Sequence, residues 1–309
     1  MARLLEPWRA GRPVTAATFL AGGLMNRNYR VRVGDDDVVL RFYDRDARAC
    51  DKEAGLLAQL FGRVAVPEVL YVAPSNETVR FAVLELVAGI SMRDLKQTGD
   101  AGSIAEASHS VGLELAALAS VRLRDPAIIA TEFAPNPDLL HGSNVNACLI
   151  DHFLESAVLR ERLGEQYVSD VHDFAWRHDD RLSATAQSSA IAHGDFNSAN
   201  ILVRQAAGRW SVAAILDWEF AFYGSPLYDI GNFLRYERAS KPRYEPWFSR
   251  GLVDSGIALP HDWRTLARVA DLSALCELLA RREAPPAVAR EVRDLVLATV
   301  RATDQIPIL

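Results

Sequence analysis

The stretch His193-Gly-Asp-Phe-Asn-Ser-Ala-Asn-Ile-Leu-Val203 decides how the rest of this 309-residue chain is interpreted. It places an acid, Asp195, five residues before an amide, Asn200, and then runs into an apolar strand. A second acid, Asp217, ends another apolar run and lies 22 residues after Asp195, a length that suits a short hairpin. Such a hairpin would bring the three polar groups to one end of two paired strands.

These three groups have the chemistry that phosphoryl transfer from a nucleotide requires. A carboxylate such as Asp195 can take the proton of a hydroxyl, and an amide oxygen with a second carboxylate can hold Mg²⁺. Each residue alone could cap a turn or a helix, but the three together are hard to explain in that way.

The composition fits a globular protein with two sizeable lobes. Half of the residues are hydrophobic and 24% are charged, which is ordinary for a chain of this length. Cys50, Cys148 and Cys276 have no paired spacing, which argues against a disulfide framework or a zinc site. No stretch has the apolar core of a signal peptide or the length of a membrane span. We therefore expect a cytoplasmic protein with no membrane partner.

The acidic residues are concentrated in the second part of the chain. Residues 1–89 carry 12 Lys and Arg against 11 Asp and Glu, whereas residues 90–309 carry 22 against 29. This excess makes nucleic acid an unsuitable partner and favours a cationic one. A solvated acidic surface that aids solubility explains the same numbers.

The hydrophobic pattern changes near Gly89. Before it, period-two runs predict five strands around one helix, with the strands at 17–21, 29–33, 38–43, 67–72 and 80–87 and the helix at 47–61. After it, helical spacing predominates, with predicted helices at 104–123, 147–163, 165–182, 229–236, 263–282 and 286–302. Residues 124–146 are predicted to form a loop.

Together these features resemble the protein-kinase-like superfamily, and more closely its aminoglycoside phosphotransferase and choline kinase branch, whose members phosphorylate small molecules. The resemblance runs from Leu20 to about Leu234 and is strongest at 193–203 and 215–234. It implies an α+β, two-lobed fold, with a small antiparallel five-stranded sheet and one helix before a larger, mostly helical lobe. Residues 1–89 would form the nucleotide-binding lobe and residues 90–309 the catalytic and acceptor-binding lobe.

The resemblance also implies roles for the central residues. Asp195 matches the catalytic base, and Asn200 and Asp217 match the two positions that hold Mg²⁺. For His193 we expect a supporting hydrogen bond that fixes the catalytic loop. Asp229 matches an aspartate that braces the same loop, although a helix N-cap would look the same.

The nucleotide, ATP or GTP, would be held mainly by the first lobe. Gly22, Gly23 and Asn26 resemble the family's short phosphate-covering turn, and a plain hairpin turn would look similar. Arg41 stands where a lysine usually meets the α- and β-phosphates. Its guanidinium is longer and planar, so the two are not equivalent. Glu53 is either the partner that orients Arg41 or a surface residue of an amphipathic helix.

The strand that links the lobes would present its backbone to the adenine edge at Glu85 and Val87. An apolar slot for the base, or ordinary core, is expected from Val39, Val83, Leu84 and Leu202.

The acceptor side is harder to assign. Glu219 lies either near the metal or acceptor, or is a buried hydrogen-bonded carboxylate. Beyond it the sequence gathers aromatic and acidic residues, namely Tyr236, Tyr244, Trp247, Phe248 and Trp263 with Glu237, Glu245 and Asp262. In a cleft they would suit a cationic acceptor by cation–π contact and ion pairing, and otherwise they are core and surface residues.

Several alternatives remain at this point. The expected acceptor is a hydroxyl of a small cationic molecule such as an aminoglycoside-like antibiotic, and the runner-up is choline, ethanolamine or another small metabolite. A nucleotide-binding pseudokinase is a third possibility, favoured only by Arg41. His172-Asp173 and His178-Asp179 suggest a metal-dependent phosphohydrolase, but their spacing puts the two histidines on different faces of a helix. We interpret them as solvated helix residues.

Overall fold

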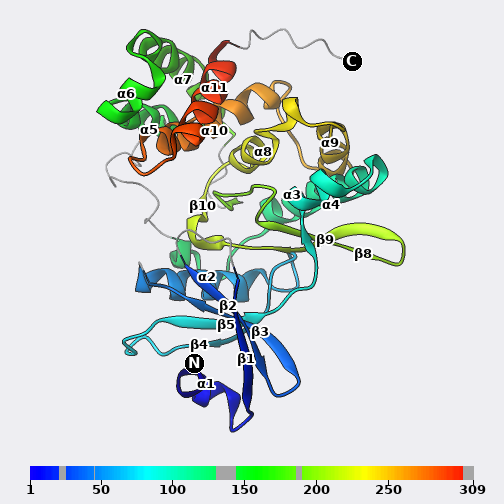
Figure 1. Ribbon diagram of the computed structural model, residues 1–309. Helices are drawn as coiled ribbons and strands as arrows, with labels where there is room; N and C mark the ends of the chain where they lie inside the picture. The colour runs from blue at the N-terminus through cyan, green and yellow to red at the C-terminus, as the bar shows by residue number, and fades with distance from the viewer. Residues whose placement is uncertain (21–25, 45, 130–143, 186–189, 302–309) are drawn as a thin grey trace.

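The computed structural model describes residues 1–20, 26–44, 46–129, 144–185 and 190–301. A small sheet-containing part at the N-terminus is followed by a larger, mostly helical part (Figure 1). The predicted α+β, two-lobed arrangement is therefore confirmed. No helix in the described part of the chain is long and apolar enough to cross a membrane.

The N-terminal sheet has five antiparallel strands in the order β1-β2-β3-β5-β4. Their bounds are β1 Val14–Leu20, β2 Arg27–Val33, β3 Asp36–Phe42, β4 Val69–Val72 and β5 Phe81–Glu85. The alternation that predicted them is visible in β3, where Leu40 and Arg41 point to opposite faces. The five-stranded sheet is thus confirmed.

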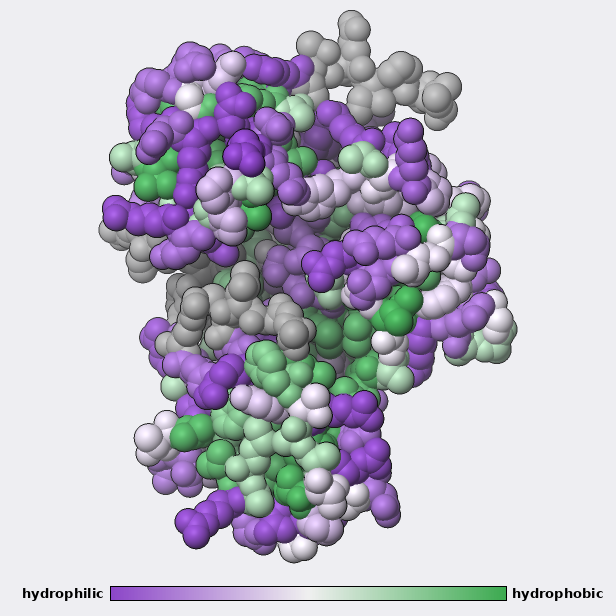
Figure 2. Space-filling view, in the orientation of Figure 1, coloured by the Kyte–Doolittle hydropathy of each residue, from purple (hydrophilic) through white to green (hydrophobic). Residues whose placement is uncertain are grey.

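The two faces of this sheet pack against different helices. On the inner face, Val39 and Leu84 pair across β3 and β5 and adjoin helix α2 (Ala47–Leu60), which Asp46 caps at its first turn. On the outer face, helix α1 (Ala2–Arg9) buries Leu5 against Val31 and Leu40. Figure 2 shows this part of the surface, at the bottom of the view, as apolar in the centre with a hydrophilic rim. The sequence analysis did not predict α1.

The C-terminal part is built around helix α10. This helix packs against α5, α6, α7, α8 and α11, while α4 packs against α9. The helices of this part are α3 Met92–Thr98, α4 Ala101–Ser120, α5 Val145–Leu154, α6 Ala157–Leu163, α7 Val168–Ser183, α8 Leu227–Leu234, α9 Glu245–Asp254, α10 Trp263–Ala280 and α11 Pro286–Arg301.

Two features of this helical part differ from the prediction. The single helix expected at 147–163 is two helices, because Ser156 caps a new helix start and accepts a hydrogen bond from the Leu159 N–H. Helices α3 and α9 were not predicted. Of the predicted loop at 124–146, residues 130–143 lie outside the described residues, and α5 begins at Val145.

The predicted hairpin is present as β8 (Ile201–Ala206) and β9 (Arg209–Ile215), with Ile201 opposite Ile215. Strand β6 (Ile90–Ser91) pairs with β8 and joins the chain entering from the first lobe to this hairpin. Gly89 comes just before β6, and a Cβ there would lie 2.8 Å from the Val203 carbonyl oxygen. The crossing between the lobes therefore depends on a close backbone approach that a side chain would obstruct. A second short pair, β7 (Ile191–Ala192) with β10 (Phe222–Tyr223), leads into the central motif.

Candidate active site

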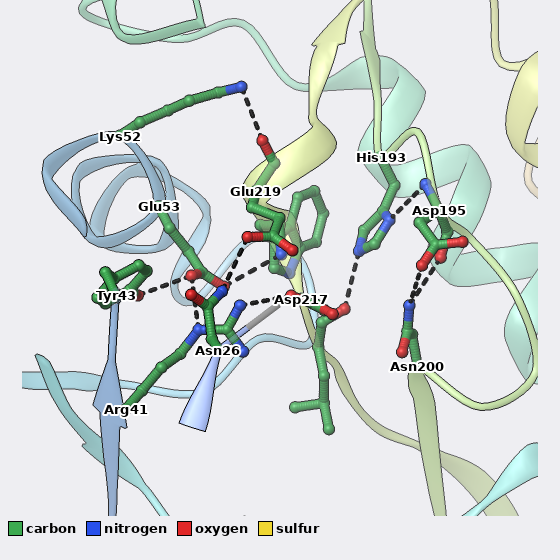
Figure 3. Close-up of polar contacts among 12 residues, drawn as sticks. Asn26, Arg41, Tyr43, Lys52, Glu53, His193, Asp195, Asn200, Asp217 and Glu219 are labelled. Carbon is green, nitrogen blue, oxygen red and sulfur yellow. Dashed lines mark hydrogen bonds and ion pairs between the residues drawn. The ribbon is translucent and has the colours of Figure 1, made fainter. Parts of the chain in front are cut away.

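Asp195 lies in the loop between β7 and β8, with its carboxylate held by two amides. Asn200 Nδ2 donates to Asp195 Oδ2 at 2.8 Å (Figure 3). Asn197 Nδ2 donates to Asp195 Oδ1 at the same distance. Both oxygens are thereby fixed in direction, while the residue stays partly exposed. A carboxylate in this state can accept a proton from a correctly placed hydroxyl.

His193 fixes this loop from inside the protein. Its side chain is fully buried, Nε2 lies 3.0 Å from the Leu216 carbonyl oxygen, and Nδ1 accepts the Asp195 N–H at 3.2 Å. These partners require the neutral ring with its proton on Nε2. Burial lowers the pKa of His193, which keeps that form. The ring therefore orients the backbone at Asp195 and Leu216 rather than carrying a proton.

Asp229, near the start of α8, accepts hydrogen bonds from the backbone of the same loop. Its two carboxylate oxygens accept the His193 N–H at 2.8 Å and the Gly194 N–H at 3.0 Å. Gly194 has φ +81°, and a Cβ there would lie 2.4 Å from the Phe220 carbonyl oxygen, so only glycine fits. Burial raises the pKa of Asp229 to about 7.

Asp217 follows β9 at the same end of the hairpin as Asn200. The two segments are joined by the Leu216 N–H, which donates to the Asn200 carbonyl at 2.8 Å. Asp217 itself has φ +69°, an uncommon conformation for a residue with a side chain and one that occurs most often at functional sites. The structure thus brings Asp195, Asn200 and Asp217 together, as the hairpin predicted.

Arg41 on β3 links this site to the N-terminal lobe. Its guanidinium forms an ion pair with Asp217, and its Nε lies 2.9 Å from Glu53 Oε2 on α2 (Figure 3). Burial alone would lower the pKa of Arg41, but the charges of Glu53 and Asp217 outweigh it and raise that pKa. Glu53 is buried and pairs with Arg41, so it is not a surface residue.

Sequence reasoning missed two residues on this side of the site. Tyr43 donates its hydroxyl to Glu53 Oε2 at 2.7 Å, and Lys52 Nζ donates to the Glu219 carbonyl at 2.9 Å. Glu53 Oε1 also accepts the Trp218 N–H at 3.1 Å, across the lobes. The only sequence feature that could have indicated these two residues is their position, since Tyr43 lies two residues after Arg41 and Lys52 lies next to Glu53.

Glu219 is held beside Asp217 by the first lobe. Its Oε2 accepts a hydrogen bond from Asn26 Nδ2 at 2.8 Å, while its Oε1 is buried without a partner among the described residues. Burial, followed by the charge of Asp217, raises the pKa of Glu219 to about 7. Glu219 is thus a half-buried, hydrogen-bonded carboxylate two residues after Asp217, and its nearness to a metal or acceptor stays a prediction.

The oxygen donors here fit Mg²⁺. Asn200 and Asp217 supply an amide and a carboxylate oxygen, and Glu219 Oε1 is a buried oxygen that lacks a described partner. The described residues contain no group of three or more His, Cys, Asp or Glu that could hold a metal. Mg²⁺ sites in nucleotide-binding proteins commonly use one or two protein carboxylates and complete their shell with substrate phosphates and water.

The linker between the lobes differs in backbone bonding at the two positions expected to meet a base. In the described residues, neither the N–H nor the C=O of Val87 has a backbone partner, whereas the Glu85 N–H is bonded to the Glu68 carbonyl. Val39 and Leu84 face the inner side, whereas Val83 pairs with Leu40 in the outer core, so of the two interpretations Val83 is an ordinary core residue. Strand alternation places consecutive residues on opposite faces. Gly22 and Gly23 lie outside the described residues.

A family model described as the phosphotransferase enzyme family matches residues 16–267. The chain belongs to the phosphotransferase enzyme family. It is accordingly a small-molecule kinase, as predicted. The match includes every residue of the site described above.

Solved structures of similar fold support the family assignment. Aminoglycoside phosphotransferase APH(4)-Ia, in a ternary complex with AMP-PNP and hygromycin B, is 18% identical, covers 97% of each chain and gives a TM-score of 0.69. A putative aminoglycoside phosphotransferase from Ralstonia eutropha JMP134 is 16% identical over 97% of this chain and 98% of its own, at 0.67. A GDP complex of an aminoglycoside 2'-phosphotransferase-IIIa mutant is 16% identical over 96% and 95%, at 0.69. At these identities the likeness concerns the fold. No curated protein matches the chain.

In this member of the phosphotransferase enzyme family, the aromatic and acidic segment after Asp217 does not form a cleft of free acids and rings. Tyr244 and Phe248 are fully buried, Glu237 is buried, and Trp263 is 8% exposed. Tyr236 and Trp247 are the exposed aromatic residues of this set. The interpretation as core and surface residues therefore applies to most of the segment.

The two His-Asp pairs on α7 do not form a metal site. His172 is exposed and its Nδ1 lies 2.6 Å from Asp151 Oδ1. His178 and Asp179 are buried, so the prediction that they are solvated is wrong. The physical reason is that Asp179 accepts the Ala147 N–H of α5 at 3.0 Å and thereby satisfies a helix start inside the core.

Proposed function

We propose that the chain is a Mg²⁺-dependent phosphotransferase that moves the γ-phosphoryl group of ATP or GTP to a hydroxyl of a small molecule. The observation that carries the proposal is the fixed position of the Asp195 carboxylate. The side-chain amides of Asn197 and Asn200 hold it, and Asp217 lies at the same end of the hairpin as Asn200. The nucleotide is supported by similar structures that contain AMP-PNP, ADP or GDP.

In the proposed reaction the acceptor oxygen forms a bond to the γ-phosphorus as the bond to the β-phosphate oxygen breaks. Asp195 accepts the hydroxyl proton or aligns the hydroxyl for in-line attack. His193 and Asp229 hold the loop that carries it. Arg41 would contact the nucleotide phosphates while remaining oriented by Glu53.

Asn200 and Asp217 would hold the metal, with Glu219 close to it. When bound, Mg²⁺ would neutralise the phosphate charge that develops during transfer. Residues 1–89, with Asn26, Glu85 and Val87, would bind the nucleotide, and residues 90–309 would supply the catalytic and acceptor-binding groups.

For the acceptor, the similar structures with hygromycin B and kanamycin support an aminoglycoside-like molecule. The sequence Asp217-Trp-Glu219 and the aromatic residues after it favoured an amino alcohol such as choline or ethanolamine. Both classes of acceptor are cationic. Whether the protein binds a cationic acceptor depends on the charges of the side chains near Asp195.

One observation favours the pseudokinase alternative. The ion pair between Arg41 and Asp217 occupies a carboxylate that the metal would need. The deciding experiment incubates the protein with Mg²⁺ and labelled ATP or GTP against aminoglycosides, amino alcohols, sugars and hydroxy acids. We expect label transfer to at least one acceptor, whereas nucleotide binding without transfer to any of them would establish the pseudokinase instead.

A further inference from the structure

The three acids after Glu219 that the sequence offers to a cationic acceptor, and Asp271 besides, are each paired with an arginine, whereas Glu219 is held by the Asn26 amide. The ion pairs are Glu237 with Arg243, Glu245 with Arg264, Asp262 with Arg181, and Asp271 with Arg235. Glu237 also accepts the Tyr244 N–H at 3.2 Å and is 4% exposed. These carboxylates are therefore neutralised within the protein, and a cationic ligand would have to displace an arginine to reach them.

A positively charged side chain of the protein also lies against the aromatic residues near the catalytic loop. Lys96 of α3 places its Nζ 4.2 Å from the ring centre of Tyr244 and 5.6 Å from that of Phe233. Tyr244 is fully buried beneath this ammonium and therefore offers no open ring face to a ligand cation. The same Nζ donates to Ser198 Oγ at 2.6 Å, which puts a positive charge on the loop that carries Asp195.

A second cation lies at the end of α8. Phe233 packs on Phe196 of the catalytic loop with ring centres 6.1 Å apart, and Arg235 follows two residues later. Arg235 Nε and Nη2 bind the two Asp271 oxygens at 2.9 and 2.6 Å, whereas its Nη1 has no described partner. Burial would lower the pKa of Arg235, but the charge of Asp271, joined by that of Asp195, raises it. The contact between Phe233 and Phe196 places this end of α8 beside the loop that carries Asp195.

We propose that the acceptor carries an anionic group, a carboxylate or a phosphate, next to the hydroxyl that is phosphorylated, and that Arg235 and Lys96 bind that group. This inference rests on the proposed function and defines its substrate class. Arg235 Nη1 would donate a charge-assisted hydrogen bond, and the Lys96 charge would hold the anion over the catalytic loop. An acceptor ammonium at the same place would instead face the like charge of Lys96, which disfavours the cationic class.

The test uses sets of acceptors that share hydroxyls and differ in charge. One set is glucuronate, glucose and glucosamine, and the other is glycerate, glycerol and aminopropanediol, with kanamycin as a polycationic reference. For a reacting set we expect kcat/KM to be about tenfold to hundredfold higher for the anionic member than for the neutral one. The cationic member should be the poorest substrate. A cationic or neutral member that reacts best would overturn the inference and leave the proposed function standing.

A double variant tests whether Arg235 binds the anionic group of the acceptor. Removing Arg235 alone would leave Asp271 buried and uncompensated, so Arg235→Gln is combined with Asp271→Asn. The control, Arg160→Gln with Glu165→Gln, removes an exposed ion pair at the end of α6. We expect the ratio of anionic to neutral kcat/KM to fall about tenfold or more in the first variant and to stay constant in the control.

The remaining outcomes are also decisive. An anionic preference that survives in the Arg235→Gln, Asp271→Asn variant would remove Arg235 from the acceptor site and contradict the inference. Absence of transfer to every acceptor of every charge, with nucleotide still bound, would contradict the proposed function itself.

Discussion

At the residue scale, Arg41 joins the charges of both lobes. Its guanidinium faces Glu53 on one side and Asp217 on the other. A planar guanidinium can meet two carboxylates at once, whereas a lysine ammonium is a compact point charge. This double pairing explains why arginine suits the position, and we expect Arg41 and the metal to share Asp217 when nucleotide binds.

Asp217 allows a direct test of the proposed metal site. Replacing it by Asn removes a charged oxygen ligand, so the gain in nucleotide affinity that Mg²⁺ provides should fall about tenfold or more. Calorimetric titration of ADP with Mg²⁺ and with EDTA measures this gain. Asp37→Asn, which alters a surface acid paired with Arg30 and Arg32, is the control. An undiminished effect of Mg²⁺ in Asp217→Asn would exclude Asp217 as a ligand.

Asp229 should make the stability of the fold depend on pH. Its native pKa of about 7 exceeds the value of ~3.9 for an unfolded aspartate, so the native state binds more protons between these values. Its contribution is fully present below about pH 4 and is lost as pH rises through about 7. In thermal unfolding, Asp229→Asn should flatten this decline relative to wild type and to the exposed control Asp173→Asn. If the stability of Asp229→Asn fell with pH in parallel with that of wild type, the result would count against the raised pKa of Asp229.

At the scale of elements, α2 carries the residue that holds the site together. Glu53 receives Arg41, the Tyr43 hydroxyl and the Trp218 N–H. Burial, and then the charge of Glu53, raise the pKa of Tyr43, which keeps it a protonated donor.

Tyr43→Phe removes that donor alone. We expect a loss of about 1 kcal/mol in unfolding free energy and an increase of about fivefold in the KM for nucleotide, with kcat retained. Steady-state kinetics at saturating acceptor separates the two constants, and Tyr71→Phe on β4 is a matched tyrosine outside the site. A fall in kcat with unchanged KM would be inconsistent with a role in orienting Arg41.

Helix α1 contributes stability to the outer face of the sheet without touching the site. Leu5 is fully buried there, so Leu5→Ala should cost about 3 kcal/mol in unfolding free energy, whereas the half-buried Leu4→Ala should cost less. Urea unfolding measures both. Equal and small losses would indicate that α1 is not anchored on the sheet.

The elements that the sequence predicted well have strong periodicity. The β8–β9 hairpin has apolar runs on both sides of a turn, and α10 and α11 keep an apolar face over four turns or more. Helix α1 was missed because it is short and contains Pro7. The break between α5 and α6 was missed because one residue, Ser156, caps the new helix within an otherwise helical pattern.

At the scale of the whole molecule, the candidate site lies where the two lobes meet. Asn26 and Lys52 reach from the first lobe to Glu219 in the second, and Arg41 reaches Asp217. The boundary near Gly89 and the division of roles between 1–89 and 90–309 stay predictions.

The sequence could predict the residues of the catalytic loop because they lie together in one motif. It could not predict the contacts between the lobes, since Asn26 and Lys52 meet Glu219 from 193 and 167 positions away along the chain. The charge of the acceptor stays a prediction, because counting acids in the sequence does not reveal which of them an arginine already neutralises. Arg235 and Asp271, which are 36 residues apart, illustrate this.

The central claim is that Asp195 receives the acceptor hydroxyl, and the most direct measurement compares Asp195→Asn with wild type in labelled phosphate transfer and in nucleotide binding. The amide keeps the shape of the side chain but cannot take a proton. We predict a loss of transfer of about a hundredfold to ten-thousandfold with nucleotide affinity nearly unchanged. Transfer at close to the wild-type rate would contradict the account.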